Sequence, residues 1–105
     1  MESEHIRVTA EEGRATAALR GEFDMAATFT VEPALERALE EPGVEALELD
    51  LSNLRFIDST GIGVLLRLVS EADRRGIDLS MTPAPRDVQR VLEVTGVRDA
   101  LPFTD

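Results

Sequence analysis

The clearest structural signal in the chain lies in ELDLSNLRFIDSTGIGVLLRLV, residues Glu48 to Val69. Its first half is rich in apolar residues typical of a buried strand, and this pattern breaks at Asp58-Ser59-Thr60-Gly61. A strongly apolar helical pattern begins immediately afterwards. The sequence therefore predicts that Ser59 lies at the mouth of a helix, where backbone N–H groups and the helix dipole favour anions. A phosphorylated serine would fit at such a position.

The chain before this stretch opens with a predicted β-hairpin. Apolar residues alternate with polar ones from His5 to Ala10, and the alternation resumes at Ala15, Ala17 and Leu19. This period-2 pattern is typical of half-buried strands. Glu11-Glu12-Gly13 between the two runs predicts the hairpin turn.

A helix is predicted to follow Gly21-Glu22-Phe23-Asp24 and to run to about Glu41, where Pro42-Gly43 would end it. Thr28 or Thr30 is expected to cap this helix, which would leave Pro33 within its first two turns. The residues expected on its inner face are Phe29, Val31, Leu35, Ala38 and Leu39.

The remaining elements alternate between strand and helix. A strand from Val44 to Leu51 is apolar enough to predict burial on both faces, and a helix from Ser59 to Arg75 follows it. Further elements are predicted at residues 77–82 (strand), 85–95 (helix with Val88, Val91 and Leu92 facing inward) and 97–103 (a turn and a brief strand). We therefore expect a single α/β domain over residues 1–105, with helices packed on a mixed, mostly parallel sheet.

Composition narrows the function classes. The 105 residues carry a formal charge of −10, which disfavours binding to nucleic acid or to anionic membranes. No cysteine is present, so disulfides and thiolate chemistry are excluded. The sequence contains neither an apolar run of about 20 residues nor the basic and apolar blocks of a signal peptide, so a soluble cytoplasmic protein is expected.

The predicted helix from Ser59 has two unlike sides. Ile62, Leu65, Leu66, Leu68, Val69 and Ala72 project onto one broad arc, which is expected to face the core. The other side carries Thr60, Gly63, Val64, Arg67, Glu71 and Arg74. Val64 is then an apolar residue on a polar flank, beside the small residues Thr60 and Gly63, and we interpret this flank as a docking surface for a partner.

Asp58 and Ser59 have a structural and a functional interpretation that are compatible. Either residue is suited to cap the helix, and a capping hydroxyl that faces solvent also remains accessible to a kinase. A phosphate on Ser59 would add about two negative charges beside Asp58, with Asp24 expected nearby at the end of an adjacent strand. Repulsion between these charges would then alter partner binding.

The residues give little support to an enzyme. A nucleophilic serine needs an adjacent base, and the only histidine, His5, lies at the start of the first predicted strand. Gly61-Ile62-Gly63 lacks the third glycine and the lysine of nucleotide-binding loops. A magnesium cluster of Asp24, Asp50 and Asp58 is conceivable, but solvated carboxylates explain these residues more simply in so acidic a chain. We therefore expect neither a metal nor a cofactor.

Three segments together resemble the STAS domain family of bacterial anti-sigma factor antagonists, and the resemblance extends over nearly the whole chain. The segments are residues 21–24 (GEFD), 49–51 (LDL) and 56–65 (FIDSTGIGVL), with further similarity at residues 91–97. Members of this family commonly continue past the last strand into a further helix, whereas this sequence ends at Asp105.

The resemblance implies a partner-switching protein in transcription regulation. The unphosphorylated form would bind an anti-sigma factor that is a serine kinase, and so release a sigma factor to RNA polymerase. The kinase, using ATP, would phosphorylate Ser59, and a phosphatase would reverse the modification. Asp24 matches the aspartate of the loop that borders the phosphorylated serine. Thr60 is serine in many members, which makes it a minor alternative site.

Two other classes remain open from the sequence. STAS modules also occur in anion transporters and signalling complexes, so a scaffold or transporter-associated subunit that is never phosphorylated is the alternative. An enzyme is the third class, and it would require turnover that depends on Ser59 and His5 together.

Overall fold

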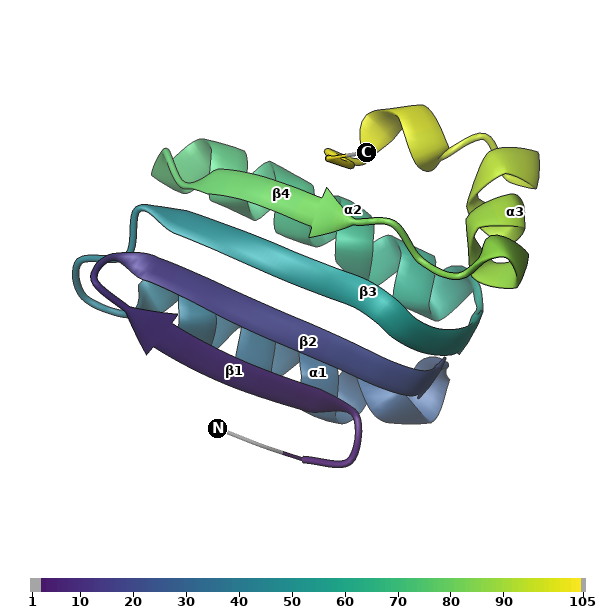
Figure 1. Ribbon diagram of the computed structural model, residues 1–105, viewed down its shortest axis with the longest axis horizontal. Coiled ribbons are helices and arrows are strands. Elements are labelled where there is room, and N and C mark those ends of the chain that lie inside the picture. The colour runs from purple at the N-terminus through teal and green to yellow at the C-terminus, as the bar shows by residue number, and fades with distance from the viewer. Residues whose placement is uncertain (1–2, 105) are drawn as a thin grey trace.

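The computed structural model describes residues 3–104 and contains one four-stranded sheet with the strand order β1-β2-β3-β4 (Figure 1). The elements in chain order are β1 (Ile6–Glu11), β2 (Arg14–Phe23), α1 (Met25–Glu40), β3 (Ala46–Ile57), α2 (Ser59–Arg75), β4 (Asp78–Thr82), α3 (Arg86–Val94) and the 3-10 helix η1 (Arg98–Ala100).

The sheet is mixed, as the sequence predicts. β1 and β2 form an antiparallel hairpin, whose turn places Glu12 and Gly13 at φ values of 52° and 82°. β2 and β3 pair in parallel, and so do β3 and β4. The predicted α/β class and mostly parallel sheet are therefore confirmed.

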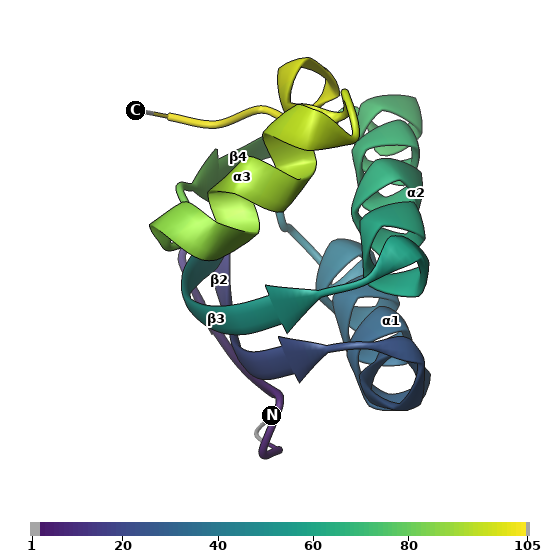
Figure 2. The same ribbon diagram turned by 90° about the vertical axis from the view of Figure 1, so that its right-hand side faces the viewer.

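Only one face of the sheet is covered by the long helices. Figures 1 and 2 show α1 and α2 side by side on the same face, while α3 lies near the end of the sheet to which β2, β3 and β4 point. In β3, Leu47, Leu49 and Leu51 are buried, whereas Glu48 between them is exposed. The prediction that this strand is buried on both faces is wrong, because α1 and α2 both lie on the same face of the sheet.

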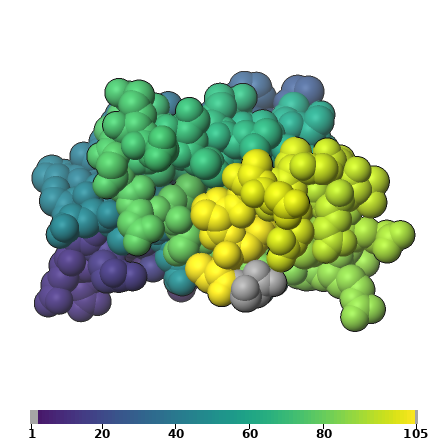
Figure 3. Space-filling model, turned by 90° about the horizontal axis from the view of Figure 1, so that it is seen from above, coloured from purple at the N-terminus to yellow at the C-terminus, as the bar shows by residue number. Residues whose placement is uncertain are grey.

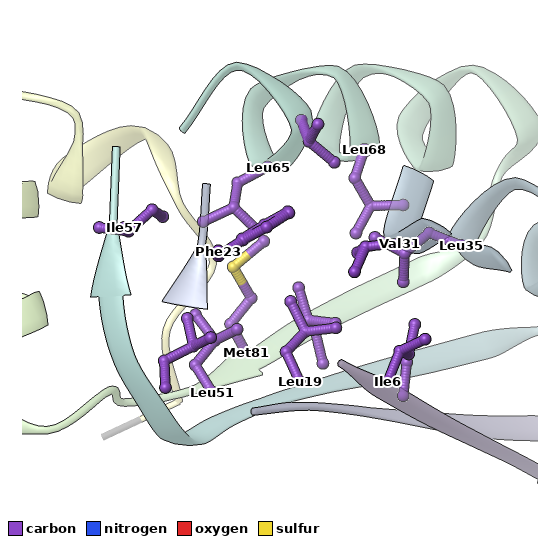
Figure 4. Close-up of a cluster of buried hydrophobic side chains, with 14 of the residues drawn as sticks. Ile6, Leu19, Phe23, Val31, Leu35, Leu51, Ile57, Leu65, Leu68 and Met81 are labelled. Atoms are coloured by element: carbon purple, nitrogen blue, oxygen red, sulfur yellow. The ribbon is translucent and has the colours of Figure 1, made fainter. Parts of the chain in front are cut away.

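The core fills the space between this sheet face and the two long helices. Figure 4 shows Leu19 and Leu51 of the sheet facing Val31 of α1 and Leu65 of α2, with Phe23 between the layers. All five side chains are at most 1% exposed. Burial of large apolar side chains of this kind contributes about 1.5–3 kcal/mol each, so this interface dominates the stability of the domain.

β3 extends further than predicted. It continues past Leu51 to Ile57, and two register shifts against β2 interrupt the pairing. Because the shifts lie in the last part of the strand, the apolar spacing changes there, and Leu54 and Ile57 are the next buried positions. The alternation of apolar and polar residues therefore stops at Leu51, which is why the predicted strand ends six residues before β3 does.

α1 begins earlier than predicted. Asp24 caps it and Met25 is its first residue, so the expected caps Thr28 and Thr30 are wrong, and Pro33 lies in the third turn. The earlier start follows from β2, which ends at Phe23 and leaves Asp24 in the extended conformation that a cap requires. Phe29, expected to face inward, is 77% exposed.

The C-terminal segment closes part of the sheet edge. Instead of a final strand, residues 98–100 form η1, and a single parallel bridge joins Phe103 to Met81 of β4. Figure 3, which looks onto this edge, shows the yellow C-terminal segment lying against β4 and α3. In α3, Val88 and Leu92 are buried as predicted, whereas Val91 is 37% exposed. Within residues 3–104, every helix is too short or too polar to cross a bilayer.

Candidate functional site

The candidate site lies where β2 and β3 end side by side. Phe23 and Ile57 are paired in the parallel register, so the residues that follow them, Asp24 and Asp58, emerge next to each other. Each aspartate caps the helix that follows it, and Figure 2 looks directly onto these two helix starts. The expectation that Asp24 lies beside the motif at the end of an adjacent strand is confirmed.

Asp58 is the cap of α2. One of its carboxylate oxygens, Oδ1, accepts hydrogen bonds from the backbone N–H groups of Thr60 (3.0 Å) and Gly61 (3.1 Å) and from the Thr60 hydroxyl (2.5 Å). These bonds lower the pKa of Asp58 below 3.8, with the hydroxyl contributing most and the Gly61 N–H next. The Met25 N–H also faces this carboxylate closely enough to lower its pKa. Asp58 is therefore ionised at neutral pH.

The two helix starts are held together by backbone contacts. The Asp58 N–H donates to the carbonyl of Phe23 (3.3 Å), and Asp24 Oδ1 accepts from the Ala27 N–H (3.0 Å). Gly61 fits against the same carbonyl, since a Cβ on Gly61 would lie only 2.5 Å from the Phe23 oxygen. The absence of a side chain at Gly61 is therefore what allows α2 to start so close to β2.

Ser59 is the first residue of α2, and its side chain is exposed. Among residues 3–104 it forms no side-chain hydrogen bond, so its hydroxyl is available to solvent. The sequence left open whether Asp58 or Ser59 caps the helix, and the structure assigns that role to Asp58 alone. The Thr60 and Gly61 N–H groups of the helix mouth are already occupied by this carboxylate.

Thr60 differs from Ser59 although it is its neighbour. Its side chain is half-buried, and its hydroxyl donates to Asp58. Modification of Thr60 would have to break this bond, which is one of the contacts that fix the cap. Of the two adjacent hydroxyls, only that of Ser59 is both exposed and uncommitted.

Only some residues of the predicted docking flank of α2 are accessible to solvent. Val64 is 2% exposed, so the expectation that it stands out from the polar side is wrong, whereas Leu66, expected in the core, is 36% exposed. The reason is that α1 packs beside α2 and buries a second side of it. Val64 instead belongs to a groove of about 200 Å³ between the two helices, with Leu35 of α1 and Leu68 of α2.

Arg67 and Gly63 do lie on the accessible side of α2. Arg67 is exposed and spans the groove to Glu32 of α1, with Nε 2.8 Å and Nη2 3.2 Å from the two carboxylate oxygens. Gly63 is half-buried, and only the Arg67 guanidinium would approach a Cβ placed there, at 3.3 Å. Ser59, Gly63 and Leu66 follow one another at helical spacing and make up the outward line of α2.

Two apolar residues at the start of α1 are exposed, and the sequence did not predict it. Met25 and Phe29 at the start of α1 are 60% and 77% exposed. Met25 lies before the caps expected at Thr28 or Thr30, so the sequence places it outside the helix, and Phe29 is expected on the inner face.

The three aspartates considered as a metal site do not gather. Asp50 lies further back in β3 and accepts hydrogen bonds from Ser52 and from the Thr82 hydroxyl (2.9 Å). These bonds lower the pKa of Asp50, the Ser52 side chain contributing most. In the part of the chain that the structure describes, no group of three or more His, Cys, Asp or Glu side chains is placed to hold a metal ion.

Comparison with known proteins identifies close counterparts of this architecture. The model of the STAS domain matches residues 5–105. The chain is 29% identical to the anti-sigma F factor antagonist of Paenibacillus polymyxa, over 83% of this chain and 74% of that protein. It is 30% identical to the anti-sigma-F factor antagonist RsfA of Mycobacterium tuberculosis, over 79% of this chain and 66% of that protein. The solved structure of the Bacillus cell fate determinant SpoIIAA in the phosphorylated form shares the fold, with a TM-score of 0.70 at 19% identity over 95% of this chain and 91% of that one.

Proposed function

The chain belongs to the STAS domain family, and we propose that it acts as an anti-sigma factor antagonist controlled by phosphorylation of Ser59. In its unmodified form it binds an anti-sigma factor that is a serine kinase, and this binding releases the sigma factor. Phosphorylation by that kinase ends the interaction, and a phosphatase restores it. The chain itself is a regulatory binding protein and performs no catalysis.

The observation that carries the proposal is the state of the Ser59 hydroxyl. It is exposed and forms no hydrogen bond with any of residues 3–104, and it follows directly on the aspartate that caps α2. A kinase needs such a hydroxyl to approach its nucleotide, and the neighbouring Thr60 hydroxyl is engaged by Asp58. The relatives named as anti-sigma factor antagonists support the same role.

Charge explains how the modification would switch binding. A phosphate adds about two negative charges at pH 7, and it would stand next to the Asp58 carboxylate, with Asp24 at the neighbouring helix start. Because Asp58 already accepts from the Thr60 and Gly61 N–H groups and Ser59 is exposed, the phosphate projects into the surface that the kinase contacts. Like-charge repulsion and the bulk of the phosphate then oppose rebinding.

Mass spectrometry and binding measurements with a purified anti-sigma factor serine kinase test this proposal. With ATP, the wild-type chain should gain one phosphate at Ser59, and Thr60→Val should gain it as well, because it retains Ser59. Ser59→Ala should gain none and should bind the kinase like the wild type. Ser59→Asp should bind at least about tenfold more weakly, since it introduces a permanent charge at the same point. A wild-type chain that stays unmodified by every anti-sigma factor kinase of its own genome would refute the proposal.

The same measurements separate the alternative function. A scaffold or transporter-associated STAS subunit would bind its partner without modification, and wild type and Ser59→Asp would then bind with equal affinity. The difference between these two variants therefore decides between a switch and a constitutive scaffold.

A further inference from the structure

Two large apolar side chains stand in solvent at the start of α1. Met25 is 60% exposed and Phe29 is 77% exposed, although most apolar residues of α1 are buried. Residues four apart on a helix are neighbours on its surface, so the two side chains form one patch. Neither contributes much to the core, and their role is unexplained by the stability of the fold.

The patch lies close to the Ser59 site through the chain and the register of β2 and β3. Met25 follows the cap Asp24 directly, and the pairing of Phe23 with Ile57 puts Asp24 beside Asp58, one residue before Ser59. Phe29 lies one turn further along α1. Glu32, three residues after Phe29, reaches across to Arg67 of α2 at 2.8 Å. Because Phe29 and Glu32 are three residues apart, Phe29 lies next to the side of α1 that carries this contact with α2.

We propose that Met25 and Phe29 form an apolar anchor that holds the anti-sigma factor kinase while it modifies Ser59. This inference rests on the function proposed above. Specific protein interfaces cover about 800 Å² of each partner, so an enzyme whose active site reaches Ser59 also covers the adjacent start of α1. Aromatic residues and methionine are enriched at interfaces, and a few large side chains supply most of the binding energy.

The charges around the anchor define the partner's complementary surface. Asp24 directly precedes Met25, and Asp58 lies beside Asp24, whereas Glu32 is paired with Arg67; the chain as a whole carries a formal charge of −10. The kinase is therefore expected to present an apolar pocket with a basic rim. Rim charges mainly raise the association rate and depend on salt, whereas a buried anchor mainly slows dissociation. The anchor should accordingly act through the dissociation rate.

Phe29→Ala is the direct test, with Val94→Ala as the matched control. Val94 is an equally exposed apolar residue (75%), but it lies in α3 outside the anchor. With the purified kinase that phosphorylates the wild-type chain, Phe29→Ala should raise KM for the chain at least about tenfold and leave kcat within about twofold. Biolayer interferometry should show the same loss as faster dissociation at both low and high salt. Val94→Ala should match the wild type in every measurement.

Phe29→Gln is a second variant that keeps a long side chain and good helix propensity. It should show the same loss as Phe29→Ala, which would exclude a helix defect as the cause. Unchanged KM and dissociation rate for both variants, with the wild type phosphorylated at Ser59, would overturn the anchor and leave the proposed function intact. A wild-type chain that is not phosphorylated at all would overturn both.

Discussion

Gly61→Ala should destabilise the domain, although alanine is the better helix former. The added Cβ would lie 2.5 Å from the carbonyl oxygen of Phe23 and 3.0 Å from Cγ1 of Ile57. The carbonyl is backbone and is held by the Asp58 N–H, so it has little freedom to move away. Overpacking of this kind costs about 1–3 kcal/mol, whereas glycine to alanine in a helix gains up to about 1 kcal/mol. We therefore expect a net loss of about 1–2 kcal/mol in the free energy of unfolding.

Gly63→Ala is the matched control two residues further along the same helix. The only atom near its new Cβ is an Arg67 guanidinium nitrogen at 3.3 Å, the far end of a flexible side chain. The helix gain should therefore dominate and stabilise the domain by about 0.5 kcal/mol or more. Urea unfolding followed by circular dichroism measures both variants, and their midpoints should fall on opposite sides of the wild type. A Gly61→Ala midpoint at or above that of the wild type would refute the close-packing argument.

Two further predictions concern charged groups. Asp58→Ala should cost about 1 kcal/mol of stability at pH 7, because it removes the helix cap. Since the pKa of Asp58 is lowered in the folded state, its contribution is complete above the unfolded value of 3.8 and is lost as the pH falls through the folded value. The stability difference between wild type and Asp58→Ala in urea should thus narrow below pH 3.8, and a constant difference would contradict the assignment. For the half-buried Glu71, hydrogen bonds from Arg74 and then Arg75 lower the pKa to about 2. An NMR titration of its carboxyl carbon should give that midpoint at low salt and a higher one in about 1 M NaCl, where such pairs are screened. A midpoint at the ordinary value of 4.5 in low salt would show that these pairs do not persist in solution.

The site was largely predictable because it depends on local signals and on one rule of parallel sheets. The break at Asp58 after an apolar run marks a strand end followed by a helix start. The carboxyl ends of parallel neighbours lie at the same edge of a sheet, so Asp24 was expected beside it. Both expectations required only the order of strands and helices along the chain. That order follows from the spacing of apolar residues, which alternate in strands and recur every three or four positions in helices.

The side chains of α2 were harder to assign because this helix is buried on two sides. A projection of one helix identifies the widest apolar arc but contains no information about a second neighbour. α1 covers the side that carries Val64, and the buried arc is therefore rotated so that Leu66 faces solvent. The choice of cap for α1 failed for a similar reason. The sequence pattern places Asp24 at the end of β2 and favours Thr28 or Thr30 as the cap, whereas the strand stops one residue earlier and leaves Asp24 to cap the helix.

The two helices that start from adjacent strands also run in step along their whole length. Asp24 corresponds to Asp58 as helix cap, Glu32 pairs with Arg67, and Glu40 with Arg75, so each pair is 34 or 35 positions apart in the chain. The order strand, capping aspartate and helix thus occurs twice in the chain, at a separation of 34 or 35 residues. One residue inserted between Ile57 and Ser59 would shift α2 by one position relative to α1, so that these pairs would no longer face each other. The same insertion in the segment from Pro42 to Glu45 lies between α1 and β3. It would leave the position of each helix relative to the strand before it unaltered.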